Sequence, residues 1–229
     1  MKRMAVLAAG LCAAALAVGC TRVVDGAAQA PESPQAAAST SAPAGPTGAP
    51  PTMGVVSTLP DTVPPNALVC LQLPRNGGGV SIAAVVGDPA APRIVLSAPS
   101  GWAATPDPRD ATAIALTGPD GLTGRITIAR TDLPPAEAFE RYSNQQLARA
   151  PIGSVSLLPA DFCGYSGQRI IGSWSGGPDG DVVYEDRVNH IWTNTGSYLV
   201  AIHVQAPKGA PGFDAAKEQL LQDYSITIP

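Results

Sequence analysis

The chain has 229 residues, of which 45% are hydrophobic and 14% are charged, and its formal net charge is −4. An average soluble domain has about 25% charged residues, so the folded part of this chain should have a rather neutral surface. No basic stripe occurs in the sequence. The charge balance therefore argues against nucleic-acid binding and against attachment to anionic lipids by charge alone.

The N-terminal segment has the pattern of an export signal. Lys2 and Arg3 are followed by an uncharged apolar run over 4–18, which is too short for a comfortable membrane span. The run ends in LAVGC at residues 16–20, which resembles a bacterial lipobox, although Ala17 stands where Leu is commonest. We expect a signal peptide over 1–19, cleavage before Cys20 and acylation of its thiol. The alternatives are an ordinary cleaved signal peptide and an uncleaved anchor helix.

Residues 20–66 are predicted to form the lipidated N-terminus and a disordered linker. Within them, 27–52 consist mostly of Ala, Pro, Ser and Thr and contain no large apolar residue. Such a segment cannot bury enough surface to offset the entropy lost on ordering. The folded domain is expected over 67–229, on the extracytoplasmic face of the cell membrane.

Four cysteines are present, and two of them have other fates. Cys12 belongs to the signal peptide and Cys20 is the predicted lipid site. Cys70 and Cys163 remain as an even pair in an oxidising compartment, so we predict a disulfide between them. Two buried thiols or a redox pair are the alternatives, but the C-x-x-C spacing of a redox pair is absent.

From residue 67 onward, short apolar and β-branched runs alternate with Gly and Pro turns, which is typical of strands. The predicted strands are 67–72, 80–86, 93–98, 113–117, 124–130, 154–158, 168–175, 182–193, 197–205 and 225–228. Their alternation predicts one buried face and one wetter face. Helices are expected at 134–149, with Asp132 as a possible cap, and at 212–223. We therefore predict an α+β domain with a single antiparallel β-sheet flanked by two main helices.

The sequence offers few candidates for catalysis. His190 and His203 are expected on neighbouring strands, where with Glu185 and Asp186 they could form a metal or acid–base site. No H-x-x-x-H or H-E-x-x-H spacing occurs, and histidines on a wet strand face are common. The GSWSG string at 172–176 lacks the serine of a nucleophile elbow at its centre and is interpreted as a strand running into a turn. We assign no catalytic residue, metal or cofactor, and we expect a protein that is not an enzyme.

Three tryptophans allow two interpretations. Trp102, Trp174 and Trp192 could form a surface that stacks on sugars or contacts lipid. They could also be the large core residues of a domain with only three phenylalanines, and we favour the core.

Several short stretches together resemble one family. They are CTRVVDG at 20–26 with the linker after it, the strand and P-S-G-W turn at 94–102, the helices from Pro134 and Gly212, and the closing ITIP at 226–229. This arrangement resembles the LpqN/LpqT family of actinobacterial lipoproteins over about residues 92–229. The resemblance implies a PsbP-like fold and a place in the mycobacterial cell envelope, and the family is not known for catalysis. Its motifs carry no functional residue that can be transferred to a position here.

The functional expectation is a non-catalytic binding module, tethered to the membrane through Cys20. It would act in envelope biogenesis by binding a lipid, a glycolipid or an envelope protein, with ligand-binding residues unassigned and a monomer expected. An enzyme acting on envelope substrates and a surface protein that engages host factors are the alternatives. A deep apolar cavity would favour ligand carriage, and a fully packed interior would favour protein docking.

Overall fold

The structure is a computed structural model that describes residues 53–57, 62–71, 79–178 and 180–229. The predicted signal peptide 1–19, the lipid site Cys20 and most of the linker 20–66 lie outside the described residues. Within the described ranges, no helix combines the length and the apolar character needed to span a membrane.

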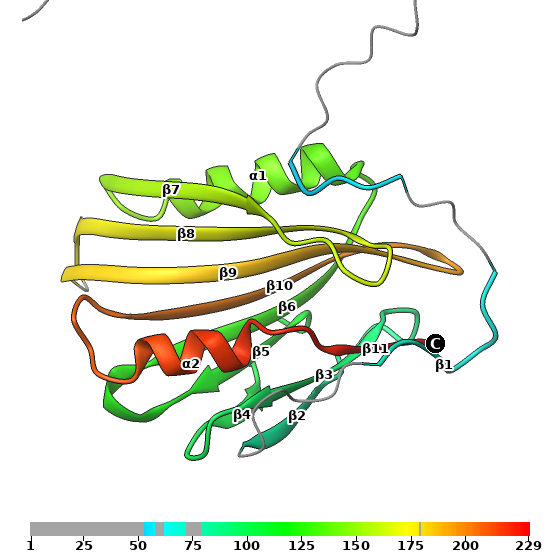
Figure 1. Ribbon diagram of the computed structural model, residues 1–229, viewed down its shortest axis with the longest axis horizontal. Coiled ribbons are helices and arrows are strands. Elements are labelled where there is room, and N and C mark those ends of the chain that lie inside the picture. Colours follow the sequence, from blue (N-terminus) through cyan, green and yellow to red (C-terminus); the bar gives the residue numbers. More distant parts are fainter. Residues whose placement is uncertain (1–52, 58–61, 72–78, 179) are drawn as a thin grey trace, which may run out of the picture. The chain divides into compact units, whose positions relative to one another are not determined.

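Most strands belong to one large antiparallel sheet of seven strands (Figure 1). From edge to edge it consists of β4 (Ala103–Pro106), β5 (Ala113–Thr117), β6 (Thr123–Thr131), β10 (Gly196–Pro207), β9 (Gly180–Thr193), β8 (Ser166–Gly177) and β7 (Ile152–Pro159). The strands β8, β9 and β10 follow one another as two hairpins and are the long ones, with 12, 14 and 12 residues. The strand running through the GSWSG string is β8, as expected.

A second, four-stranded antiparallel sheet lies against the first. Its order is β1 (Ala67–Cys70), β11 (Ser225–Ile228), β3 (Arg93–Ala98) and β2 (Val80–Ala84). The expected single sheet flanked by two helices, the PsbP-like description, is therefore wrong. The large sheet has an apolar face over β6 and β10 that needs a cover, and α2 (Phe213–Leu220) has only 8 residues. The small sheet supplies the rest of that cover.

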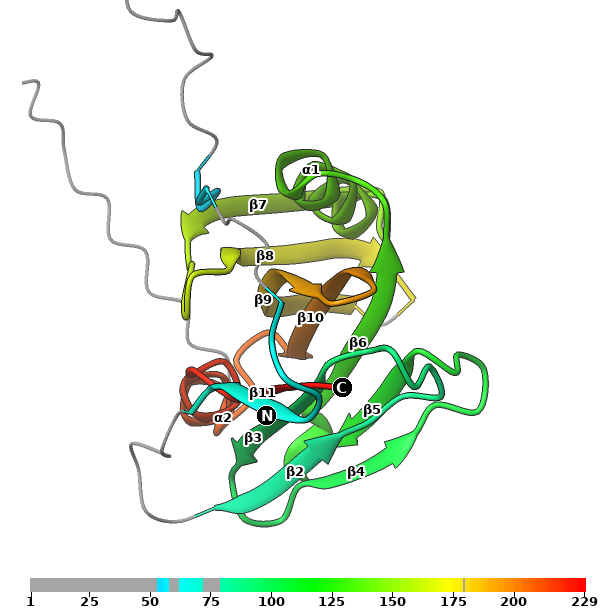
Figure 2. The same ribbon diagram turned by 90° about the vertical axis from the view of Figure 1, so that its right-hand side faces the viewer.

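Both faces of the large sheet are covered at its centre (Figure 2). Along β10, Val200 and Ile202 lie in the core shared with the small sheet and α2. Leu199 and Ala201 lie in the core beneath α1 (Pro135–Leu147). The expectation of a wetter face is wrong for these strands, because alternation shows that a strand has two faces without showing what covers each.

Both helices are shorter than expected, and Asp132 does not cap α1. Pro134 is the N-cap residue of α1 and makes no side-chain cap. Pro135 occupies the first turn, where its missing N–H leaves no intrahelical bond unmade. Phe139 is 1% exposed and anchors the helix on the sheet.

The predicted disulfide is confirmed. Cys70 at the end of β1 is bonded to Cys163 in the turn before β8, with a Cα–Cα distance of 5.8 Å. The bond therefore joins an edge strand of the small sheet to the large sheet. Cys70 is buried at 2% exposure.

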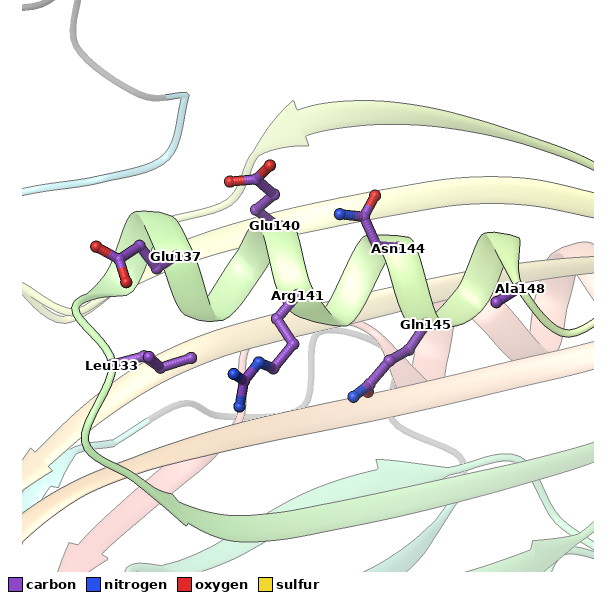
Figure 3. A pocket seen from close by; sticks show the side chains of 7 residues that line it. All are labelled: Leu133, Glu137, Glu140, Arg141, Asn144, Gln145 and Ala148. Atoms are coloured by element: carbon purple, nitrogen blue, oxygen red, sulfur yellow. The ribbon is translucent and has the colours of Figure 1, made fainter.

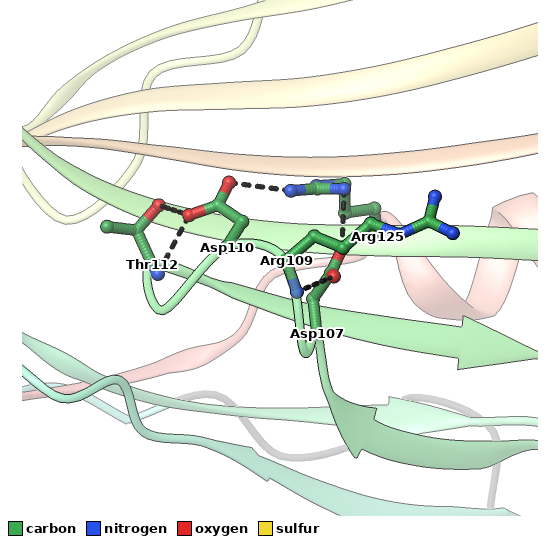
Figure 4. Close-up of polar contacts among 5 residues, drawn as sticks. All are labelled: Asp107, Arg109, Asp110, Thr112 and Arg125. Carbon is green, nitrogen blue, oxygen red and sulfur yellow. Dashed lines mark hydrogen bonds and ion pairs between the residues drawn. The ribbon is translucent and has the colours of Figure 1, made fainter.

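A polar clamp closes the turn between β4 and β5 (Figure 4). The Arg125 guanidinium of β6 donates one hydrogen bond to Asp107 at 2.7 Å and another to Asp110 at 2.6 Å. The hydroxyl and backbone N–H of Thr112, helped by Arg125, lower the pKa of Asp110. Both Nη atoms of Arg125 hydrogen-bond to carboxylates of this turn, which indicates a structural role for Arg125.

Candidate functional site

One hollow of the described surface lies at the end of the large sheet where α1 begins. It measures about 270 Å³. Three strands bring its floor together: Ser166 of β8 pairs with His190 of β9, and Trp192 of β9 pairs with Ser197 of β10. The lining residues are Val55, Val56, Ser57, Pro135, Tyr165, Ser166, His190, Trp192 and Ser197.

This hollow combines ring surfaces with hydroxyl groups. Tyr165, His190 and Trp192 supply the rings, and the hydroxyls come from Ser57 and Ser197, since the Ser166 hydroxyl is engaged by the Val56 backbone. Among its described lining residues there is no Asp, Glu, Lys or Arg. Such a lining suits a neutral ligand that has both an apolar surface and hydroxyl groups.

The surroundings of His190 and Tyr165 favour the neutral forms of both side chains. Burial lowers the pKa of His190, although a hydrogen bond from its Nε2 to the Leu133 carbonyl at 3.0 Å opposes this. Burial raises the pKa of Tyr165. The hollow therefore stays uncharged around neutral pH.

One wall is formed by Met53–Ser57, which sequence reasoning placed in the linker. The Gly167 N–H donates to the Gly54 carbonyl at 2.8 Å, and the Val56 N–H donates to the Ser166 hydroxyl at 3.0 Å. Gly54 has a φ of +77°, and an added Cβ would lie 1.9 Å from the Gly167 carbonyl oxygen, so only glycine fits there.

A second attachment follows a few residues later. The Val63 N–H donates to Asn194 Oδ1 at 3.1 Å, and Asn194 Nδ2 donates to the Val63 carbonyl at 3.0 Å. One feature of the sequence indicates that Met53–Ser57 belongs to the folded domain. MGVV at 53–56 is the first apolar and β-branched run after the Ala, Pro, Ser and Thr tract.

The structure separates the two histidines proposed as a site. Both lie on neighbouring strands, as expected, and they share the α1 side of the sheet. His203 pairs across the strands with Asp186, whereas His190 pairs with Leu199. Four residues of strand separate the two positions, which corresponds to roughly 13 Å. They therefore do not form one centre.

His203 and Asp186 form a buried pair beneath α1. The Nδ1 of His203 hydrogen-bonds to Asp186 Oδ1, and its Nε2 contacts Gln205 Oε1 at 2.9 Å. Asp186 is 0% and His203 is 6% exposed, so the expected wet surface is wrong for this histidine. The Asp186 Oδ2 has no hydrogen-bond partner among the described residues.

Aromatic rings surround this pair. The Trp174 ring stacks on Tyr184 at a centroid distance of 4.2 Å and lies 5.7 Å from the His203 ring. Gly172 makes room for Tyr184, because a Cβ there would lie 2.2 Å from the Tyr184 ring. The first glycine of the GSWSG string therefore has a packing role.

Glu185 points to the opposite face of the sheet from Asp186. It forms an ion pair with Arg169 and lies 3.6 Å from the Lys217 ammonium of α2. The proposed grouping of Glu185 and Asp186 with the two histidines is therefore not formed. Within the described ranges, no group of three or more His, Cys, Asp or Glu side chains could hold a metal ion.

The tryptophans divide between the two interpretations. Trp102 and Trp174 are 6% and 8% exposed and belong to the cores, as favoured from the sequence. Trp192 is only partly buried and lines the hollow beside His190.

A larger but shallower hollow, of about 530 Å³, runs along the outer side of α1 (Figure 3). Glu137 and Glu140 project from one side of the helix, and Arg141 and Gln145 project from the other. All its lining residues except Leu133 lie on or directly after this one helix. It is charged and has no opposing wall from a second element, so it is a weaker candidate for a ligand site.

Comparison with known proteins gives a fold and no family. No family model matches the chain, and no curated protein matches it. Two solved structures align with TM-scores below 0.5. One is from Bacteroides thetaiotaomicron, at 15% identity, 57% of this chain, 44% of that chain and a TM-score of 0.34. The other is the Saccharomyces cerevisiae Ran-binding protein Mog1p, at 13% identity, 64% of this chain, 95% of that chain and a TM-score of 0.40.

A third structure is more similar. It is LpqN, described as involved in cell envelope biogenesis of Mycobacterium tuberculosis. The alignment covers 65% of this chain and 91% of that chain, at 17% identity and a TM-score of 0.50. At this identity the likeness concerns architecture alone. The described domain therefore has an LpqN-like fold.

Proposed function

We propose that this protein is a non-catalytic binding module of a bacterial cell envelope that holds the neutral headgroup of a glycolipid. The single observation that carries the proposal is the uncharged hollow lined by Tyr165, His190 and Trp192. The LpqN-like fold supports the envelope setting, since LpqN is described as acting in envelope biogenesis. Membership of the LpqN/LpqT family is part of the same proposal.

The chemistry of the hollow selects among possible ligands. A pyranose ring has apolar C–H faces that stack on aromatic rings and hydroxyl groups that exchange hydrogen bonds with serines. Its volume of about 270 Å³ admits a single small headgroup and excludes a folded protein domain. The absence of charged lining residues among those described disfavours phosphate and carboxylate ligands.

The proposed role is binding and not catalysis. The Asp186–His203 pair is the best candidate for acid–base chemistry, and it is buried under α1. Both ring nitrogens of His203 are engaged by protein oxygens. A general base needs a free path to its substrate proton, which this packing does not offer.

The anchor completes the proposal. Cleavage before Cys20 and acylation of its thiol would hold the domain on the extracytoplasmic face, with residues 20–52 as a tether. Replacing Cys20 by Ala should abolish the incorporation of a labelled fatty acid into the chain in a mycobacterial host. Equal incorporation by the wild type and C20A, or none by the wild type, would contradict the lipid anchor.

The headgroup site is tested with the full chain in lipid nanodiscs and n-octyl-β-D-glucoside below its micelle-forming concentration. We expect saturable binding by calorimetry. W192A should weaken it about tenfold, whereas W192F, which keeps a stacking ring, should stay within about threefold. R141A, in the hollow on the outer side of α1, is the matched control and should bind like the wild type.

Two competition measurements distinguish binding of the sugar headgroup from binding of the alkyl chain. Free glucose should compete with the glucoside, and octanol should not. Absence of binding to the glucoside, or equal loss in W192A and R141A, would refute the site. Competition by octanol alone would show that the hollow binds the alkyl chain and would also refute the headgroup proposal.

A further inference from the structure

Strand β7 is an open edge of the large sheet. In the sheet order it has β8 on one side and no described strand on the other (Figure 1). It pairs with β8 without a register shift over all eight residues, Ile152–Pro159. Its outer backbone N–H and C=O groups therefore form a regular template for another strand.

The sequence of β7 lacks the residues that usually protect an edge strand, and α1 contacts the strand. Natural edge strands are blunted by Lys, by bulges or by inward-pointing charges. The β7 sequence, IGSVSLLP, contains no charged residue, and its one proline is at the very end. On the face away from α1, Ile152 is 67% and Leu158 is 45% exposed, and Ser154 and Ser156 lie between them. Exposed apolar side chains therefore stand near both ends of the open edge, with serines between them.

We propose that the occupant of this edge is a second copy of the same chain, paired β7 to β7 around a two-fold axis at Val155. The sequence of β7 favours a second copy as the partner strand. In that antiparallel register, Ile152 faces Leu158 of the second copy, and Ser154 faces Ser156 of the second copy. Every position on this face then meets a residue of its own kind, apolar against apolar and serine against serine.

The other face agrees with the same register. Gly153 is opposite Leu157 of the second copy, so a small residue accepts a large one. Val155 meets its own symmetry mate, a β-branched pair that suits a pleated surface. Because β7 is uncharged, a second copy brings no like charge to the contact. A seven-residue pairing spans about 23 Å, which is short, so the dimer is weak and forms where the chain is concentrated.

The test is a cysteine scan of the full chain in the membranes of a mycobacterial host. Single cysteines replace Gly153, Ser154, Val155, Ser156 and Leu157 in turn, followed by mild oxidation and non-reducing electrophoresis. Directly opposed strand residues have Cα atoms about 4.5–5.5 Å apart, within disulfide range, whereas the diagonal neighbours are about 7–8 Å apart. V155C should therefore give several-fold more covalent dimer than the other four.

The controls decide the outcome. The wild type measures background, and T105C on the opposite edge strand β4 measures random collision. A maximum at another position would overturn the register, and equal yields with T105C would overturn the interface. Adducts with other proteins and no dimer band would overturn the choice of a second copy.

A charge pair gives a second readout on the V155C background. S154K with S156K places like charges opposite each other twice, and S154K with S156E places opposite charges there. Both variants carry the same exposed positions, so general unfolding affects them alike. The first should lose the dimer and the second should retain it. Equal behaviour of the two would contradict the proposed pairing.

Discussion

Removing the disulfide between Cys70 and Cys163 should cost a large part of the stability of this domain. The bond links residues 93 positions apart. In the chain-entropy model, a loop of this length raises the free energy of unfolding by about 4–5 kcal/mol. For a domain of this size each kcal/mol moves Tm by roughly 2–4 °C, so reduction should lower Tm by about 10–20 °C.

The assay is urea unfolding followed by tryptophan fluorescence, on the oxidised wild type, the reduced wild type and a C70A/C163A variant. Comparing oxidised and reduced protein isolates the covalent bond, and the variant adds only the loss of two small side chains. A difference below about 1 kcal/mol between oxidised and reduced protein would refute the loop-closure argument. Amide exchange should also show β1 opening first on reduction, because its only described strand partner is β11.

Two other predictions concern buried polar groups. H203F alone should destabilise the domain by about 3–5 kcal/mol, because it leaves the Asp186 carboxylate buried without its partner, and adding D186V should recover most of the loss in the same urea assay. All five tyrosines should titrate late in the folded protein, since burial raises the pKa of each of them, to about 12 for Tyr184 and Tyr198. The stability from the Tyr184 and Tyr198 phenols is fully present below about pH 10 and is lost as the pH rises through about 12, so alkaline unfolding should coincide with phenolate absorbance. The tyrosines concerned are Tyr142, Tyr165, Tyr184, Tyr198 and Tyr224.

The sequence predicted most strands and both helices because their signals are local. Ile126 and Ile128 alternate with half-buried neighbours, as the pattern required. The pairing of Cys70 with Cys163 could also be predicted, because only these two cysteines remained after the signal peptide and the lipid site were assigned. These inferences need only composition, spacing and period.

The division into two sheets could not be predicted in the same way. β1 pairs with β11 between residues more than 150 positions apart, from Ala67 to Ile228. Strand propensity does not name a partner at that distance. The burial of His203 was missed for a related reason, since the rings packed against it, Trp174 and Tyr184, come from the other strands β8 and β9.

The hollow was missed because one wall comes from the segment that composition assigned to the linker. The Val55 and Val56 pair resembles the start of a strand, but it precedes the expected domain boundary. Its role depends on the hydrogen bonds to Gly167 and Ser166, far along the chain. No short-range pattern records such a contact.

The pairing of β1 with β11 also sets the timing of folding. The small sheet joins the first described strand of the domain to its last, so it can close only after the last strand has been synthesised. Until then the apolar face over β6 and β10 lacks most of its cover. A chain that emerges N-terminus first would therefore stay open to chaperones or to export machinery until synthesis of the domain ends. The Cys70 and Cys163 thiols would then be oxidised together to the disulfide by an oxidant of the extracytoplasmic compartment, after that closure.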